Sequence, residues 1–171
     1  TDEALGDLLS RLERLRYRAI DRWGGQAFLD ALNVYQAGDA AYLDKNYAAA
    51  LRHYREAIKL LDPFFDRIDN VFRTTLAAAD EALARGDHVE AIRLYDLAVA
   101  ITPGSAEAEK GLVRAQNLEA VMSLTAQGVQ YEEDLELEAA KLSFEKALEL
   151  DTEWQPAAVG LERVRIALRE W

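Results

Sequence analysis

The chain repeats one short pattern three times, and this repetition constrains the fold more than any other feature of the sequence. Each copy has a small residue, an aromatic residue four positions later and an alanine three positions beyond that. The three copies are Ala50/Tyr54/Ala57, Ala91/Tyr95/Ala98 and Ala140/Phe144/Ala147. Steps of four and three place these side chains on one face of an α-helix. A further small residue precedes each copy by twelve positions, at Gly38, Ala79 and Gly128. We expect the small residues to let two helices approach closely, while the aromatic ring fills the space to the next pair.

Helical periodicity runs along nearly all of the 171 residues, and no stretch alternates between apolar and polar side chains as a half-buried strand does. The periodicity predicts a first helix from Asp2 to Trp23, ended or kinked by Gly24-Gly25, and then helices in pairs. The later helices are predicted at residues 26–43, 47–61, 64–84, 89–101, 105–133 and 137–150, and from about Pro156. Asp62-Pro63 and Thr102-Pro103-Gly104 are expected to end the helices before them. Because the turns within pairs are short, the partners are antiparallel neighbours, and the sequence predicts an all-α row of helix hairpins.

The pattern resembles the tetratricopeptide repeat (TPR), a unit of about 34 residues that forms two antiparallel helices. The resemblance covers about residues 31–152, and Pro103 matches the proline near the end of the family's unit. The turn glycine of the family is present at Gly86, whereas Lys45 and Leu135 replace it in the other two copies. The resemblance implies a right-handed superhelical stack of antiparallel helix hairpins, a TPR-like α-solenoid. It implies a single domain, 1–171, whose expected parts are a lead-in helix (1–25), unit 1 (26–63), unit 2 (64–104), unit 3 (105–152) and a half unit or capping helix (153–171).

The spacing of the copies departs from that of the family. Successive copies lie 41 and 49 residues apart, measured from Ala50 to Ala91 and from Ala91 to Ala140. The surplus over the family's unit is about two helical turns in the first case and about four in the second. Added whole turns keep an apolar face directed at its neighbours. The spacing therefore predicts elongated first helices rather than inserted loops.

The longer period recurs near the end of the chain. Gly111-Leu112 with Arg114 reappears 49 residues later as Gly160-Leu161 with Arg163, so the last helix resembles the first half of a fourth unit. We expect the native chain to continue beyond Trp171, whose ring marks a surface that further chain covers. Residue 1 is Thr and not Met, which indicates an excised piece or a processed product.

The composition excludes several kinds of partner and chemistry. The formal net charge is −11, so a nucleic-acid partner is not expected. Residues 130–153 carry nine acidic side chains against two lysines, whereas residues 1–25 balance five arginines with five acids. These arginines suit an acidic partner or lipid head groups, but ion pairs within the first helix are the favoured interpretation. The chain has no cysteine and no apolar run long enough to span a membrane, so we expect no direct membrane insertion.

No set of residues predicts catalysis. His53 and His88 are the two histidines, and neither belongs to a metal-ligand spacing such as HExxH. The acidic run from Glu132 to Glu136 offers ligands for a divalent cation or contacts for a basic partner, but a solvated turn is favoured because the calcium-loop order is missing. We therefore expect no enzyme activity, no metal and no cofactor.

The family resemblance also implies a ligand-binding groove lined by the first helix of each unit. Carried over by unit position, the predicted groove residues are Tyr35, Asp39, Tyr42, Arg73, Leu76, Asp80, Leu83, Thr125, Val129 and Glu132. The lining is aromatic, aliphatic and acidic, which predicts an amphipathic or extended segment with apolar anchors and basic flanks. The alternative is that these residues pack against the first helix, Asp2 to Trp23, which then fills the groove.

The leading hypothesis is a protein–protein interaction scaffold that binds a partner peptide or protein segment in a concave helical groove, without catalysis. The alternative is a structural spacer or self-association module, acting through its terminal helices, in a larger and membrane-anchored bacterial protein. The expected compartment is the bacterial periplasm for an anchored protein and the cytoplasm otherwise.

Overall fold

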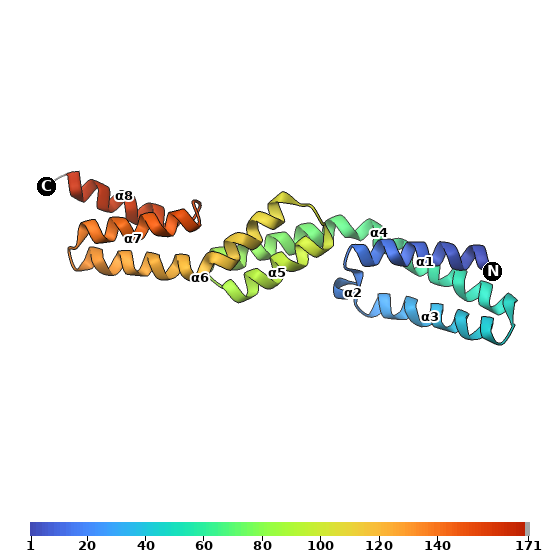
Figure 1. The fold of residues 1–171 in the computed structure, drawn as a ribbon. Helices are drawn as coiled ribbons and strands as arrows, with labels where there is room; N and C mark the ends of the chain where they lie inside the picture. The colour runs from blue at the N-terminus through green and yellow to red at the C-terminus, as the bar shows by residue number, and fades with distance from the viewer. Residues whose placement is uncertain (170–171) are drawn as a thin grey trace. The chain divides into compact units, whose positions relative to one another are not determined.

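The computed structural model describes residues 1–169, and every regular element in that range is an α-helix (Figure 1). The helices described are α1 (Asp2–Tyr17), α2 (Ile20–Trp23), α3 (Gly25–Leu43), α4 (Tyr47–Ala84), α5 (His88–Ile101), α6 (Ala106–Glu133), α7 (Leu137–Leu150) and α8 (Gln155–Arg169). Successive helices pack in antiparallel pairs, so the predicted all-α fold of TPR-like hairpins is confirmed. The right-handed superhelix and the single domain with its unit boundaries stay predictions. Trp171, expected to mark a covered surface, lies outside the described residues.

The helices contribute to two compact units. The N-terminal unit consists of Thr1–Leu76 and Asp96–Ser105, and the C-terminal unit consists of Ala77–Tyr95 and Ala106–Trp171. Helices α4 and α5 each supply residues to both units. Helix α6 has 28 residues and begins and ends within a residue of the predicted helix at 105–133.

The predicted helix end at Asp62-Pro63 is wrong, because α4 passes through Pro63 without interruption. A proline inside a helix costs about 3 kcal/mol, since it removes one backbone hydrogen bond and its ring crowds the preceding turn. The Pro63 ring is exposed to solvent, while Leu61, Phe64 and Ile68 on the other face are buried. Each such burial contributes about 1.5–3 kcal/mol, so the apolar stripe around Pro63 outweighs the local cost.

The predicted unbroken helix from Asp2 to Trp23 is also wrong, because α1 ends at Tyr17. Ala19 adopts a left-handed backbone conformation with φ of 61°, and the short helix α2 follows it. The indole Nε1 of Trp23 donates a hydrogen bond of 2.8 Å to the carbonyl of Arg18. The Arg18 guanidinium in turn donates to the carbonyl oxygen of Ile101 at 2.5 Å. These contacts surround the break between α1 and α2. The break lies before Gly24-Gly25, where the sequence predicted the helix to end.

The three repeat rings of Tyr54, Tyr95 and Phe144 are buried, with at most 1% of their surface exposed. Each ring lies against a glycine of a facing helix, where a methyl group would overlap the ring carbons. The glycines are Gly38 against Tyr54, Gly111 against Tyr95, and both Gly128 and Gly160 against Phe144. The prediction that small residues allow close approach while the rings are wedged between helices is therefore confirmed for Gly38 and Gly128, whereas Gly111 and Gly160 were not predicted in this role.

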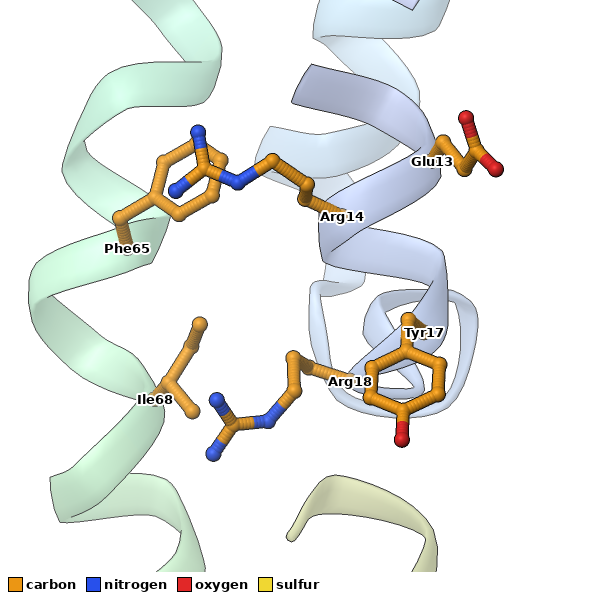
Figure 2. A pocket seen from close by; sticks show the side chains of 6 residues that line it. All are labelled: Glu13, Arg14, Tyr17, Arg18, Phe65 and Ile68. Carbon is orange, nitrogen blue, oxygen red and sulfur yellow. The ribbon is translucent and has the colours of Figure 1, made fainter. Parts of the chain in front are cut away.

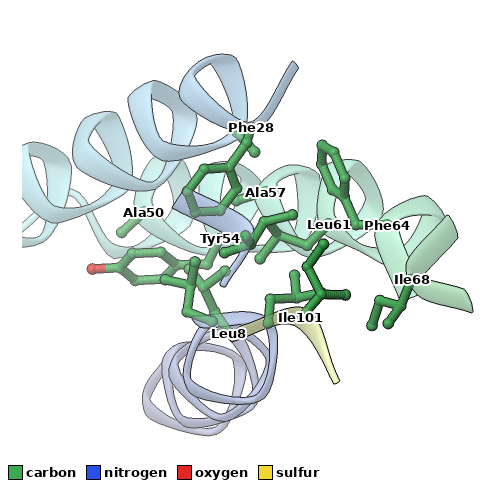
Figure 3. Close-up of a cluster of buried hydrophobic side chains, with 13 residues drawn as sticks. Leu8, Phe28, Ala50, Tyr54, Ala57, Leu61, Phe64, Ile68 and Ile101 are labelled. Carbon is green, nitrogen blue, oxygen red and sulfur yellow. The ribbon is translucent and has the colours of Figure 1, made fainter. Parts of the chain in front are cut away.

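Helix α1 takes part in the core of the N-terminal unit although it lies outside the repeats. Its buried side chains are Leu8, Leu12 and Leu15, and they belong to one cluster with the Tyr54 ring (Figure 3). Arg11 pairs with Asp62 of α4, and the Arg14 guanidinium lies 4.6 Å from the centre of the Phe65 ring. Both pairs are separated by 51 residues, so α1 runs beside the first half of α4 in the same direction.

Candidate functional site

Three of the predicted groove residues lie on α3, in the N-terminal unit. The Tyr35 ring is half-buried and its centre is 6.2 Å from that of Tyr54. Asp39 accepts a hydrogen bond of 2.6 Å from the Tyr54 hydroxyl. Burial raises the pKa of Tyr54, and the hydrogen bond to Asp39 raises it further. Burial also raises the pKa of Tyr35, with the charge of Asp39 as the second cause. One carboxylate oxygen of Asp39 is thus bonded to a neighbouring tyrosine.

The third α3 residue, Tyr42, contacts the first helix. Its hydroxyl donates a hydrogen bond to Asp2 at 3.4 Å. Its ring packs edge-to-face on Tyr47, with the two ring centres 5.3 Å apart. The charge of Asp2 raises the pKa of Tyr42. Of the two predicted residues on α4 in this unit, Arg73 is exposed and Leu76 is buried.

The other predicted residues lie in the C-terminal unit and fall into two groups. Thr125 is buried and donates to the carbonyl of Val121 in its own helix at 2.7 Å. Val129 is 37% exposed. Glu132 accepts two hydrogen bonds from Arg163, at 2.9 and 2.8 Å, and the hydrogen bond to Arg163 lowers the pKa of Glu132. All three residues lie in the C-terminal part of α6.

The remaining two predicted groove residues, Asp80 and Leu83, line a pocket. It has a volume of about 410 Å³, and we call it the α4–α8 pocket. Its full lining is Asp80, Leu83, Ala84, Arg114, Glu153, Trp154, Gln155 and Pro156. A smaller pocket of about 200 Å³ shares Asp80, Arg114 and Glu153 with it and reaches toward Tyr95. The structure thus brings two predicted groove residues together with side chains from α6 and from the turn before α8.

The polar groups around the α4–α8 pocket hold one another in place. The Arg114 Nε atom donates to both carboxylate oxygens of Asp151 at 3.0 Å, and Asp151 is only 4% exposed. Glu153 pairs with Lys110 at 2.8 Å, and the hydrogen bond from Lys110 lowers the pKa of Glu153. Asp80 accepts a hydrogen bond from the Tyr95 hydroxyl. The result is an ordered rim of fixed charges around the pocket.

The walls of this pocket are apolar where Leu83, Trp154 and Pro156 line it. Leu83 is 3% exposed, and the Trp154 indole Nε1 is buried without a hydrogen-bond partner in the described chain. Such a space suits an apolar side chain entering from outside. Apolar walls beside fixed polar groups are the usual lining of a binding pocket.

Sequence reasoning missed Arg114, Glu153 and Trp154 as parts of this pocket. The signal that points to Arg114 is the recurrence of Gly111 and Arg114 at Gly160 and Arg163, whereas no sequence signal points to Glu153 or Trp154. Gly111 and Gly160 each lie sixteen residues after a buried repeat ring, which brings the helix that carries Arg114 against the preceding hairpin.

A second pocket of about 410 Å³ lies between α1 and α4 in the N-terminal unit, and we call it the α1–α4 pocket (Figure 2). Its lining is Glu13, Arg14, Tyr17, Arg18, Phe65 and Ile68. None of these residues was predicted as a groove residue, because the pocket depends on α1, which carries no repeat signature.

Among residues 1–169 there is no group of three or more histidine, aspartate or glutamate side chains arranged to hold a metal ion. His88 lies 3.6 Å from Glu119, and His53 is half-buried on α4. Within the same range, no helix combines the length and the apolar character that crossing a membrane requires.

Comparison with curated proteins finds a significant relative. The chain is 34% identical over 118 residues to the photosystem I assembly protein Ycf3 of Acaryochloris marina (strain MBIC 11017). The match covers 69% of this chain and 64% of that protein, so the chain spans less than two thirds of the relative's length. No family model matches the chain, and no solved structure matches it with statistical significance.

This chain is a TPR-like helical protein with distant homology to Ycf3. The relative is named for the assembly of photosystem I and not for a catalysed reaction. Neither the homology nor the fold identifies a specific partner for this chain.

Proposed function

We propose that this chain is a protein-interaction scaffold that takes part in the assembly of a protein complex. It binds a segment of a partner protein along its first helices and performs no catalysis, with no cofactor. Two independent features support the proposal: the homology to a protein named for complex assembly, and a helical repeat fold with open pockets.

The observation that carries the proposal is the α4–α8 pocket. Asp80 and Leu83 come from positions that face ligands in the TPR family, and they line one pocket with the apolar side chains of Trp154 and Pro156. A partner that inserts one apolar side chain there gains about 1.5–3 kcal/mol from its burial. That is too little for a stable complex by itself, so a longer segment with further contacts is needed.

The charge of the surroundings favours basic residues beside this anchor. The C-terminal unit contains eighteen acidic and nine basic residues, and Asp80 and Glu153 lie at the pocket itself. Negative potential attracts and orients a basic segment and speeds its association. We therefore propose an apolar anchor flanked by lysine or arginine as the chemistry of the bound segment.

The other predicted groove residues divide into two roles in this proposal. Arg73 and Val129 are exposed and remain available to a partner. Tyr35 and Tyr42 are better explained by packing, since one lies against Tyr54 and the other contacts Asp2 of α1. The alternative that α1 covers part of the groove is thus favoured for Tyr42.

A filled pocket tests the proposal. Ala84 is exposed and lines the α4–α8 pocket, so Ala84→Trp fills the space without altering the core. Ala126→Trp, at an exposed position of α6 that does not line the pocket, is the matched control. The probe is a short fluorescein-labelled peptide with one leucine between lysines, and fluorescence anisotropy gives its Kd. We expect Ala84→Trp to weaken binding about tenfold, the equivalent of about 1.4 kcal/mol, and the control to change nothing. Equal Kd values for both variants, or no binding by the wild type, would contradict the proposal.

Self-association is a second candidate function, favoured by apolar side chains exposed on α8. Val159 is 53% and Ile166 is 45% exposed on that helix. Sedimentation velocity over a hundredfold range of concentration separates the two functions. A self-association module gives a concentration-dependent sedimentation coefficient that Val159→Ser with Ile166→Ser abolishes, whereas a scaffold for other proteins stays monomeric.

A further inference from the structure

The α1–α4 pocket combines an apolar floor with a positively charged wall. Phe65 and Ile68 of α4 form the floor, and Ile68 is only 7% exposed. Arg14 and Arg18 of α1 extend across from the opposite side, while the Glu13 carboxylate points away from the space (Figure 2). The Tyr17 ring, 69% exposed, completes the edge of the pocket.

Arg14 differs from Arg11, Arg16 and Arg22 in having no acidic partner. Among the described residues, Arg11 pairs with Asp7 and Asp62, Arg16 with Asp21, and Arg22 with Asp96, but no carboxylate lies within 4 Å of the Arg14 guanidinium. Its contact is with the Phe65 ring, 4.6 Å away. Stacking uses the face of a planar guanidinium and leaves the N–H groups at its edge available to a carboxylate.

Arg18 adds a second positive charge that is fixed in position. Its Nε donates to the Ile101 carbonyl at 2.5 Å and its Nη2 donates to the Thr102 hydroxyl at 3.2 Å. Both acceptors are uncharged, so the positive charge of Arg18 is not neutralised. Arg14 and Arg18 are four residues apart on one helix face, where like charges repel each other. An anion bound between them relieves that repulsion.

We propose that the α1–α4 pocket binds an acidic segment of a partner protein, in which a carboxylate pairs with Arg14 and an adjacent aromatic side chain enters above Phe65 and Ile68. The site differs in unit and in charge preference from the α4–α8 pocket. An acidic segment is repelled by the C-terminal unit, with eighteen acids against nine bases, and meets far less repulsion at the nearly balanced N-terminal unit.

A protein segment fits this surface better than an anionic membrane does. The five arginines of residues 1–25 are balanced by five acidic side chains, so this stretch has no net positive charge to attract a charged bilayer. The uncompensated charge is local, at Arg14 and Arg18, and it lies beside a pocket large enough for an aromatic ring. Local charge beside an apolar pocket selects a carboxylate placed next to such a ring.

The test uses the whole chain and a short fluorescein-labelled peptide in which phenylalanine is flanked by glutamates. Fluorescence anisotropy at low salt is measured for the wild type, for Arg14→Gln and for Arg52→Gln, an exposed arginine of α4 that does not line the pocket. We expect Arg14→Gln to weaken binding about tenfold and Arg52→Gln to change it less than twofold. We expect Tyr17→Ala to weaken binding severalfold, and peptides with serine for phenylalanine or glutamine for glutamate to bind weakly. Thermal unfolding followed by circular dichroism verifies that each variant folds.

Four outcomes overturn the proposal. The first is the absence of binding by the wild type, and the second is equal weakening by Arg14→Gln and Arg52→Gln. The third is a lysine–phenylalanine peptide that binds as tightly with the same dependence on Arg14. The fourth is Arg14-dependent binding to phosphatidylglycerol vesicles without binding to the peptide, which would assign the site to lipid. Ala84→Trp is expected to leave this binding unchanged, so failure of one site is distinguishable from failure of the other.

Discussion

The two units bury the same repeat ring in different ways. In the C-terminal unit, Tyr95 and Phe144 each lie against a glycine sixteen residues later, at Gly111 and Gly160, on the helix that follows. In the N-terminal unit, the residue sixteen positions after Tyr54 is Asn70, which lies on the same helix α4. Helix α1 supplies apolar cover there through its buried leucines, of which Leu8 lies beside Tyr54 (Figure 3). A repeat motif thus requires a buried partner for its ring but does not require that the next repeat supply it.

The repeats also differ in the polar contact of the ring. Tyr54 and Tyr95 donate to the aspartates fifteen residues earlier, Asp39 and Asp80. The third repeat has Phe144, and Val129 occupies the position fifteen residues before it. A buried phenol hydroxyl needs a hydrogen-bond acceptor, whereas a phenyl ring does not. Each copy therefore pairs its ring with a suitable residue fifteen positions earlier: aspartate for tyrosine and valine for phenylalanine.

The units differ in charge as well. The N-terminal unit has thirteen acidic and eleven basic residues, and the C-terminal unit has eighteen and nine. Most of the net charge of −11 therefore belongs to one unit. This asymmetry is the reason for assigning a basic segment to the α4–α8 pocket and an acidic one to the α1–α4 pocket.

The largest expected effect tests whether α1 is the cover of the N-terminal unit. Leu8 is fully buried, and Leu8→Ala is expected to lower the free energy of unfolding by about 3 kcal/mol, because it removes buried methyl groups and leaves a cavity. Leu9→Ala, at a 45% exposed position of the same helix, is expected to change it by less than about 0.5 kcal/mol. Urea denaturation gives both values. Equal effects would show that α1 does not cover the core.

The second effect tests the glycine contacts of the C-terminal unit. A methyl group at Gly111 overlaps the Tyr95 ring, so Gly111→Ala is expected to cost about 2 kcal/mol despite the better helix propensity of alanine. Gly6→Ala in α1, where nothing lies within 4 Å, is expected to stabilise the protein by about 0.5–1 kcal/mol. Opposite signs in thermal denaturation support the account, and a stabilising Gly111→Ala would refute it.

A smaller effect tests the tyrosine–aspartate contacts. Tyr95→Phe removes the hydroxyl that donates to Asp80 and is expected to cost about 1 kcal/mol. In the Asp80→Ala background the same change is expected to cost clearly less, because the acceptor is gone. A double-mutant cycle measures the coupling, and zero coupling energy would indicate that the hydroxyl is satisfied elsewhere.

The smallest effect is a dependence of stability on alkaline pH. The pKa values of Tyr54 and Tyr95 are raised in the folded chain, with burial as the main cause. The unfolded chain therefore loses these protons first, so the stability from the two neutral phenols is fully present below about pH 10 and falls as the pH rises above it. Denaturation between about pH 8 and 11 should show a shallower decline for Tyr54→Phe with Tyr95→Phe than for the wild type. Parallel curves would contradict the assignment.

Local periodicity was enough to predict the hairpins and the buried rings, because both depend on side chains three or four residues apart. The predicted helix end at Pro63 was wrong because only the local cost of the proline is visible in the sequence. Burial of Leu61, Phe64 and Ile68, which lie on both sides of Pro63, stabilises the continuous helix through tertiary contacts. The break at Ala19 has the same origin, because the contact of Arg18 with Ile101 spans 83 residues.

The candidate sites were predicted only in part. Asp80 and Leu83 follow from repeat position, but the other walls of the α4–α8 pocket come from α6 and from the turn before α8. The α1–α4 pocket depends on pairs such as Arg14 and Phe65, which are 51 residues apart and follow no repeat. A repeat pattern gives the register of equivalent helices and carries no information about a helix outside it.

A single NMR experiment tests the central difference between the units most directly. In a NOESY spectrum, we expect cross-peaks from the Tyr54 ring to the methyl groups of Leu8 in α1, and from the Tyr95 and Phe144 rings to the α-protons of Gly111 and Gly160. A Tyr54 ring without contacts to α1, in a chain that keeps both glycine contacts, would contradict the account.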